Sequence, residues 1–350
     1  MNPIPAGDQM FVSFTELIDL ASEKVGGKAL ATNDDFFAPM ANLLKAAPAV
    51  FIPDKFTEFG KWMDGWESRR KRNLGPGNDH DWCVIQLGMP GRIDGVNIDT
   101  AHFVGNYPEY ASLEACAVAP GSSFESIQKA QWREVLSKSK LQGGSSNLFA
   151  VASSERFTHL RLRIFPDGGV ARLRVHGRVL PDWDLLKRSG ATVDLAAAEN
   201  GGTVSACNDH FFGPKDNLIF PGRAQTMGEG WETRRKRGPG NDWIIVKLGR
   251  AGRIQKIEVD TNHFKGNFPE SCSIEGCVLP GPALLSSDFR DRADIAWTEI
   301  LPRTKLQAHH QHYFEKELHQ AALTQKFDYV RLTIFPDGGV SRLRVFGALD

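Results

Sequence analysis

Two blocks of polar residues could carry chemistry, and each block occurs twice in the 350-residue chain. The first block runs from a Trp-Glu pair through a basic cluster into a Gly-Pro-Gly-Asn turn, over residues 64–82 and again over 229–243. Guanidinium groups bind carboxylates through paired hydrogen bonds, so the block predicts a carboxylate site. A solvated basic turn would have the same composition. The candidate ligand-binding residues are Arg69, Arg70, Arg72 and Asn78, with Arg234, Arg235, Arg237 and Asn241 in the second copy.

The second block is a short loop that holds a histidine, an asparagine and two carboxylates. Histidine and carboxylates are common proton-transfer groups. They are also metal ligands, so a divalent ion such as manganese could bind here without being required. A purely structural alternative is that the aspartate caps the loop and the histidine satisfies backbone groups. The candidates are Asp99, His102, Asn106 and Glu109, repeated as Asp260, His263, Asn267 and Glu270.

A third repeated segment, residues 164–175 and 334–345, alternates apolar residues with arginine on both sides of a Pro-Asp-Gly-Gly turn. This pattern predicts a β-hairpin. We expect turn roles for the aspartates and outward-facing arginines that pair with acids on neighbouring strands. These residues are Asp167, Arg172 and Arg174, and Asp337, Arg342 and Arg344 in the second copy.

The repeats also predict the elements that must position these side chains. A period of about 165 residues is a whole domain rather than a solenoid unit, which indicates domains over residues 1–180 and 181–350. Short runs with alternating apolar residues, such as 254–261, are separated by Gly, Pro and Asn turns. We therefore expect an all-β chain with a β-sandwich in each half. Few helices are expected, and the candidates are residues 15–24 and 193–200.

Composition narrows the function class. Forty-two basic residues balance 42 acidic ones, which argues against nucleic-acid or membrane-surface binding. The chain has no apolar run of the length that crosses a bilayer and no apparent signal peptide. Its five cysteines have no CxxC spacing, which favours free thiols in a reducing compartment. These features predict a cytoplasmic protein.

Together, the repeated motifs GWE[ST]RRKR, GPGNDW, HFxGNxPE and IFPDGG resemble the allantoicase family of purine (allantoin) catabolism, from about Asp19 to Gly347. This resemblance implies two tandem jelly-roll domains similar to the discoidin or galactose-binding fold. It also implies a hydrolase that acts on C–N bonds of linear ureido or amidine groups and converts allantoate to ureidoglycolate and urea. No cofactor is required by the motifs, and a homo-oligomer is compatible with this architecture.

Allantoate chemistry suggests a role for each candidate. The arginines would bind the substrate carboxylate, the asparagines would hold its ureido groups, and the histidines or glutamates of the second block would transfer protons. The repeats leave open whether each half holds a site. The alternative is a tandem ligand- or carbohydrate-binding protein without catalysis, because jelly rolls often only bind.

Overall fold

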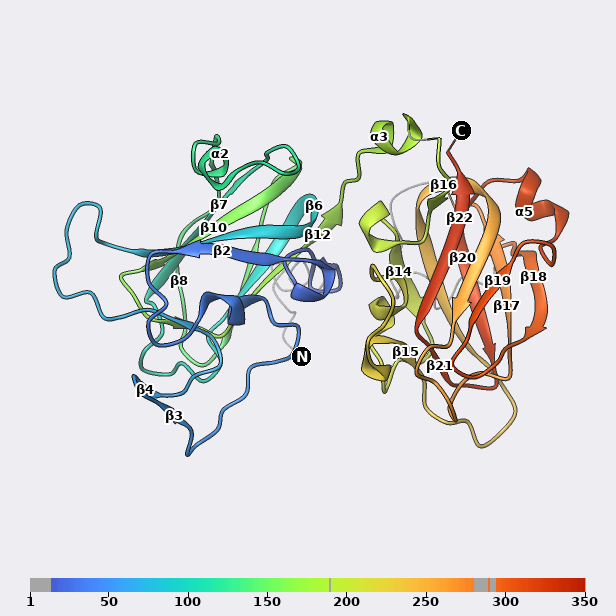
Figure 1. Cartoon of the computed structure of the whole chain (residues 1–350), viewed down its shortest axis with the longest axis horizontal. Coiled ribbons are helices and arrows are strands. Elements are labelled where there is room, and N and C mark those ends of the chain that lie inside the picture. Colours follow the sequence, from blue (N-terminus) through green and yellow to red (C-terminus); the bar gives the residue numbers. More distant parts are fainter. Residues whose placement is uncertain (1–13, 189, 280–288, 290–293, 350) are drawn as a thin grey trace, which may run out of the picture. The chain divides into compact units, whose positions relative to one another are not determined.

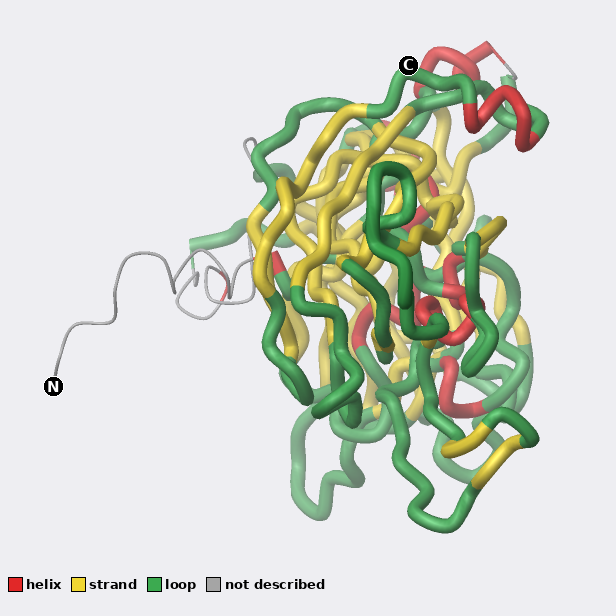
Figure 2. The backbone as a smooth tube through the Cα atoms, turned by 90° about the vertical axis from the view of Figure 1, so that its left-hand side faces the viewer, coloured by secondary structure: helices red, strands yellow, loops and turns green. Residues whose placement is uncertain are grey.

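The computed structural model describes residues 14–188, 190–279, 289 and 294–349. The chain divides into two compact units, Met1–Leu180 and Pro181–Asp350, which run from blue to green and from yellow-green to red in Figure 1. Within the described residues, strands predominate and helices are short (Figure 2). Each unit contains an eight-stranded antiparallel sheet. The prediction of an all-β fold with two repeated domains is confirmed.

One long strand organises the first unit. The start of β6 (Asp81–Asp99) pairs with β2 (Lys28–Thr32) and β10 (Phe157–Phe165), whereas its end pairs with β9 (Ser146–Ala150) and β12 (Arg172–Val179). β6 therefore contributes to both layers of the jelly roll. The other strands are β1 (Ile18–Asp19), β3 (Phe56–Thr57), β4 (Gly60–Lys61), β5 (Trp66–Glu67), β7 (Tyr110–Cys116), β8 (Arg133–Lys140) and β11 (Gly169–Val170).

The second unit repeats this plan around β16 (Asp242–Asp260). Its start pairs with β14 (Thr203–Cys207) and β20 (Phe327–Phe335), and its end pairs with β19 (Gln311–Phe314) and β22 (Arg342–Ala348). The other strands are β13 (Val193–Asp194), β15 (Trp231–Glu232), β17 (Ser271–Cys277), β18 (Thr298–Lys305) and β21 (Gly339–Val340).

Alternating side chains form the core between the layers. In β10, Leu160, Leu162 and Ile164 are fully buried, whereas Arg161 and Arg163 between them are partly exposed. Successive residues of a strand point to opposite faces, so this period of two places one face in the core. All five cysteines are free thiols. No helix in the described ranges is long and apolar enough to cross a membrane.

The two predicted opening helices are wrong. Residues 15–24 contain strand β1, and residues 193–200 contain strand β13. Asp19 accepts hydrogen bonds from the backbone N–H groups of Ala21 and Val175, which fixes an extended turn in place of a helix. Pairing with the last strand of each unit therefore overrides the local helical pattern. The helical segments are η1 (Glu23–Val25), η2 (Met40–Leu44), α2 (Phe124–Gln128), α3 (Trp183–Arg188), η3 (Ala198–Asn200), η4 (Lys215–Ile219), η5 (Met227–Glu229) and α5 (Gln320–Thr324).

The predicted hairpin is also wrong. β10 and β12 both pair with β6, at its two ends, rather than with each other. The residues between them leave the main sheet, and β11 pairs with β5. Arg172 does not point outward, because it is only 1% exposed and its guanidinium lies 2.6 Å from the Asp64 carboxylate. Its counterpart Arg342 is also buried and donates to backbone carbonyls.

Candidate active site

The basic block begins at a buried tryptophan that anchors it. Trp231 is fully buried in β15, and its indole N–H donates to the Asp209 carbonyl at 2.8 Å. The next residue, Glu232, lies between two segments: β15 pairs with β21, and the Glu232 carbonyl accepts from the N–H groups of Phe212 and Gly213. Trp66 and Glu67 have the same arrangement in β5, where the indole donates to the Asp34 carbonyl. These small sheets fix where the basic cluster starts.

The basic side chains then separate. Arg69 and Arg234 turn to Asp34 and Asp209, at 2.7 and 3.1 Å, on the exposed surface. Lys236 reaches the fully buried Asp242 at 2.7 Å. The structure therefore divides what the sequence presents as one cluster. In the first unit, Lys71 and Asp81 form the equivalent buried pair. The other arginines of the cluster are exposed, namely Arg70, Arg72, Arg235 and Arg237.

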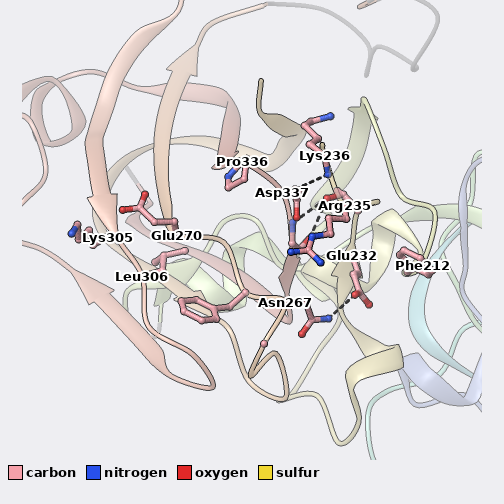
Figure 3. Close-up of a pocket in the computed structure, with 14 residues that line it drawn as sticks. Phe212, Glu232, Arg235, Lys236, Asn267, Glu270, Lys305, Leu306, Pro336 and Asp337 are labelled. Carbon is pink, nitrogen blue, oxygen red and sulfur yellow. Dashed lines mark hydrogen bonds between the residues drawn. The ribbon is translucent and has the colours of Figure 1, made fainter. Parts of the chain in front are cut away.

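A cavity of about 640 Å³ lies beside this block in the second unit (Figure 3). Small-molecule sites commonly have volumes of about 300–1,000 Å³. Three of the predicted site residues line it, namely Arg235, Asn267 and Glu270. The charged or amide side chains that line it are Glu232, Arg235, Lys236, Asn267, Glu270, Lys305 and Asp337.

The second block connects to the first through its asparagine. Asn267 donates from its amide nitrogen to the Glu232 carboxylate at 2.6 Å, as Figure 3 shows. Asn106 donates to Glu67 at 2.7 Å in the first unit. Burial raises the pKa of the Glu67 carboxyl, and the hydrogen bond from Asn106 opposes part of this effect. Two blocks that are distant in the sequence thus meet in each unit at a glutamate–asparagine pair.

The histidines of the second block lie elsewhere. His102 and His263 have positive φ angles of 70° and 69°. Their Nε2 atoms lie 3.2 and 3.1 Å from the carbonyl oxygens of Ala49 and Ala224. His263 is not among the residues that line the cavity. The structure therefore does not bring it together with Asn267 and Glu270.

The first aspartates of this block hold the loop. Asp99 accepts from the backbone N–H of Ala101 at 2.8 Å. Asp260 is fully buried, accepts from the N–H of Asn262 and pairs with Arg223 at 2.9 Å. Asp260 lines a different hollow from the cavity of Figure 3. Both contacts match the loop-capping alternative for these residues.

The remaining predicted residues lie at different places. Glu270 is exposed and pairs with Arg303 at 3.3 Å, and hydrogen bonds from Ser271 and Arg303 lower the pKa of its carboxyl. Glu109 is exposed at the same point of its loop. Asn78 donates to the Asn73 carbonyl and accepts from Lys71. Asn241 lines a separate hollow, away from Asn267.

The turn that was predicted as a hairpin closes the cavity. Asp337 accepts from the backbone N–H of Lys236 at 2.7 Å, as Asp167 does from Lys71. Gly338 follows with a φ of 136°, and a Cβ atom there would lie 2.6 Å from the Asn267 carbonyl oxygen. Only glycine fits both the conformation and the contact. This turn therefore holds the asparagine loop against the basic block.

The candidate metal ligands of the second block have protein partners in the structure. Within the described residues, no group of three or more His, Cys, Asp or Glu side chains is placed to hold a metal ion. Asp260, His263 and Glu270 are each occupied by other partners.

Sequence reasoning missed several residues at the cavity. Glu232 and Lys236 stand inside the first repeated block, and Asp337 stands in the third. Their occurrence in both copies was the available signal. Lys305, which also lines the cavity, stands in a Lys-Leu-Gln segment, residues 305–307, that repeats residues 140–142.

The chain was compared with known protein families, sequences and structures. The allantoicase repeat matches residues 18–180 and again residues 193–350. The chain belongs to the allantoicase family. It is 49% identical over 335 residues to the allantoicase of Dictyostelium discoideum, with 95% of this chain and 87% of the relative covered. It is 48% identical to the probable allantoicase 1 of Burkholderia mallei, with 99% of each chain covered.

A solved allantoicase has the same fold. The crystal structure of the Saccharomyces cerevisiae enzyme matches with a TM-score of 0.78 at 34% identity, and the alignment covers 99% of this chain and 98% of that one. The predicted family and all-β jelly-roll fold are therefore confirmed. A tandem binding protein without catalysis is not favoured, because the named relatives are allantoicases and probable allantoicases.

Proposed function

We propose that the protein hydrolyses allantoate to ureidoglycolate and urea. Membership of the allantoicase family over nearly the whole chain carries this proposal. The cavity of the second unit supplies a site with matching chemistry, since it combines cations, an amide and carboxylates. The substrate is a small molecule whose central carbon bears one hydrogen, one carboxylate and two ureido groups.

The cations of the cavity suit the substrate carboxylate. Lys236 is paired with Asp242, whereas none of the described carboxylates pairs with Arg235 or Lys305. A guanidinium offers two parallel N–H donors to a carboxylate, so Arg235 is the carboxylate-binding residue of this proposal. Lys305 adds a second positive charge on the opposite side of Glu270 from Arg235 (Figure 3).

The amide of Asn267 suits a ureido group. Its nitrogen donates to Glu232, which leaves its carbonyl oxygen as an acceptor for a ureido N–H. The cleaved bond joins nitrogen to an aminal-type carbon, so no covalent nucleophile is required. Proton transfer to the departing nitrogen and from water is sufficient, and such transfers contribute about 10²–10⁴-fold in rate.

The direct test is urea release from allantoate by the purified protein. The assay is run on untreated protein, on chelator-treated protein and after manganese is added back. We expect stoichiometric urea and ureidoglycolate. Calorimetric titration with allantoate serves as the control for binding without turnover. Binding without urea under every metal condition would contradict the enzyme and favour the ligand-binding alternative.

A further inference from the structure

The cavity of Figure 3 contains three carboxylates, and they differ in what else they bind. Asp337 accepts the backbone N–H of Lys236 and helps to hold the turn. Glu270 is exposed and paired with Arg303. Glu232 accepts one hydrogen bond from Asn267, and among the described residues no cation pairs with it. It is therefore the lining carboxylate best able to accept a proton.

The position of Glu232 is rigid. It follows the fully buried Trp231, lies opposite Gly339 of β21, and accepts hydrogen bonds at its carbonyl from the N–H groups of Phe212 and Gly213. A catalytic side chain on a rigid element is already in its reactive position, so no free energy is needed to reorganise it during the reaction. Arg235, three residues later, lines the same cavity. Strand β15 and the residues directly after it thus present a base and a carboxylate-binding cation to the same cavity.

The first unit contains the same arrangement. Glu67 follows Trp66, is clamped by β11 and by the backbone of Phe37 and Ala38, and accepts from Asn106. Burial raises the pKa of the Glu67 carboxyl, which strengthens it as a base. The hydrogen bond from asparagine to glutamate has nearly the same length in both units, 2.7 and 2.6 Å.

We propose that Glu232 in the second unit, and Glu67 in the first, are the proton-transfer groups of C–N bond cleavage. This assignment rests on the proposed function and differs from the histidine and glutamate candidates of the second block. It also implies that each unit holds a working site.

The steps balance with the carboxylate alone. The glutamate takes the proton from the N–H of the retained ureido group, and that electron pair forms a C=N bond. The bond from carbon to the other ureido nitrogen breaks, and this nitrogen takes the bonding pair and the proton from the glutamic acid, which releases urea. The carboxylate then takes a proton from water as the water oxygen bonds to carbon. It returns this proton to the imine nitrogen, which yields ureidoglycolate and regenerates the carboxylate.

The experiment compares Glu67→Gln, Glu232→Gln and the double variant with wild-type protein in the urea assay. Glutamine keeps the acceptor oxygen for Asn106 or Asn267 but cannot take a proton. We expect each single variant to retain the turnover of the other unit. The double variant should lose at least about 10²-fold in kcat, with KM changed by less than about threefold. Glu125→Gln, on an exposed helix, is the control.

A pH profile separates chemistry from structure. In wild-type protein, kcat should fall on the acid side as the base becomes protonated, and this limb should be absent from the residual activity of the double variant. In the Glu67→Gln background, Glu232→Asp should be faster than Glu232→Gln, because aspartate restores a carboxylate that can take a proton. The assignment is wrong if the double variant keeps kcat within about threefold of wild type, or if its acid limb is unchanged. Absence of urea from wild-type protein would instead refute the proposed function.

Discussion

A buried ion pair in the first unit offers a sharp stability test, because the matching arginine of the second unit has no carboxylate partner among the described residues. Asp64 is 6% exposed, and its carboxylate contacts Arg172 at 2.6 Å, Lys45 at 3.2 Å and the Val50 N–H at 3.1 Å. At the matching position of the second unit, the Glu229 carboxylate accepts from the Gln225 N–H, and Arg342 donates to the backbone carbonyl of Glu229 instead of to its carboxylate. The perturbation is therefore Asp64→Asn, and the control is Glu229→Gln.

Removing one partner of a buried ion pair costs about 3–5 kcal/mol, because the other charge is left uncompensated. Arg172 retains hydrogen bonds to the carbonyls of Ala47, Ala171 and residue 64, which favours the lower end of that range. About 3 kcal/mol corresponds to a fall of about 6–12 °C in the melting temperature of a unit of this size. We expect Glu229→Gln to change the free energy of unfolding by less than about 0.5 kcal/mol, as for an ordinary surface substitution.

Differential scanning calorimetry from pH 7 down to pH 3 provides the measurement. Burial alone would raise the pKa of Asp64, but hydrogen bonds from Arg172, Val50 and Lys45 outweigh it and lower that pKa. A lowered folded-state pKa stabilises the unit above the unfolded pKa, and this stability is lost as pH falls through the folded value. The difference between wild type and Asp64→Asn should therefore shrink in acid. Equal shifts for Asp64→Asn and Glu229→Gln at pH 7 would refute the reasoning.

Three further predictions concern the second unit. In the Glu67→Gln background, where the second unit supplies the turnover, Arg235→Met should raise KM for allantoate by about 10–100-fold through loss of a charged hydrogen bond, while Arg133→Met, a surface control, should not; an unchanged KM in that background would remove Arg235 from the site. Burial raises the pKa of Asp194 to about 6, so this unit should lose stability as pH rises from 4 to 7, and Asp194→Asn should flatten that dependence in thermal melts. Gly338→Ala should lower the free energy of unfolding of this unit by about 2 kcal/mol or more, whereas Gly266→Ala, where a Cβ atom meets open space, should not. Equal midpoints of urea unfolding for the two variants would contradict the close packing at Gly338.

The sequence predicted the sandwich well because alternation is a local property. The buried leucines and the arginines of β10 follow directly from a period of two. Strand pairing is not local. The residues around Asp167 have the composition of a hairpin turn, yet β10 and β12 pair with opposite ends of β6. Arg172 became buried for the same reason, since its burial depends on Asp64, 108 residues away.

Three of the predicted candidate residues lie together in the structure. Arg235, Asn267 and Glu270 meet at the cavity, because separate repeated blocks converge where loops leave the sandwich. His263 and Asp260 lie elsewhere, since the left-handed backbone at His263 turns its ring to the Ala224 carbonyl. No spacing rule reveals that turn.

The duplication also separates what the fold requires from what the site requires. A buried arginine follows β11 and β21 in both units, but Arg172 is neutralised by Asp64 whereas Arg342 is held by carbonyls of Gly222, Glu229 and Ser341. The same fold therefore stabilises a buried arginine in two different ways. At the cavity, the glutamate–asparagine pair takes one form in both units, with 2.7 and 2.6 Å hydrogen bonds. The pair thus keeps the same partners and geometry in both units, as a proton-transfer role in each unit requires.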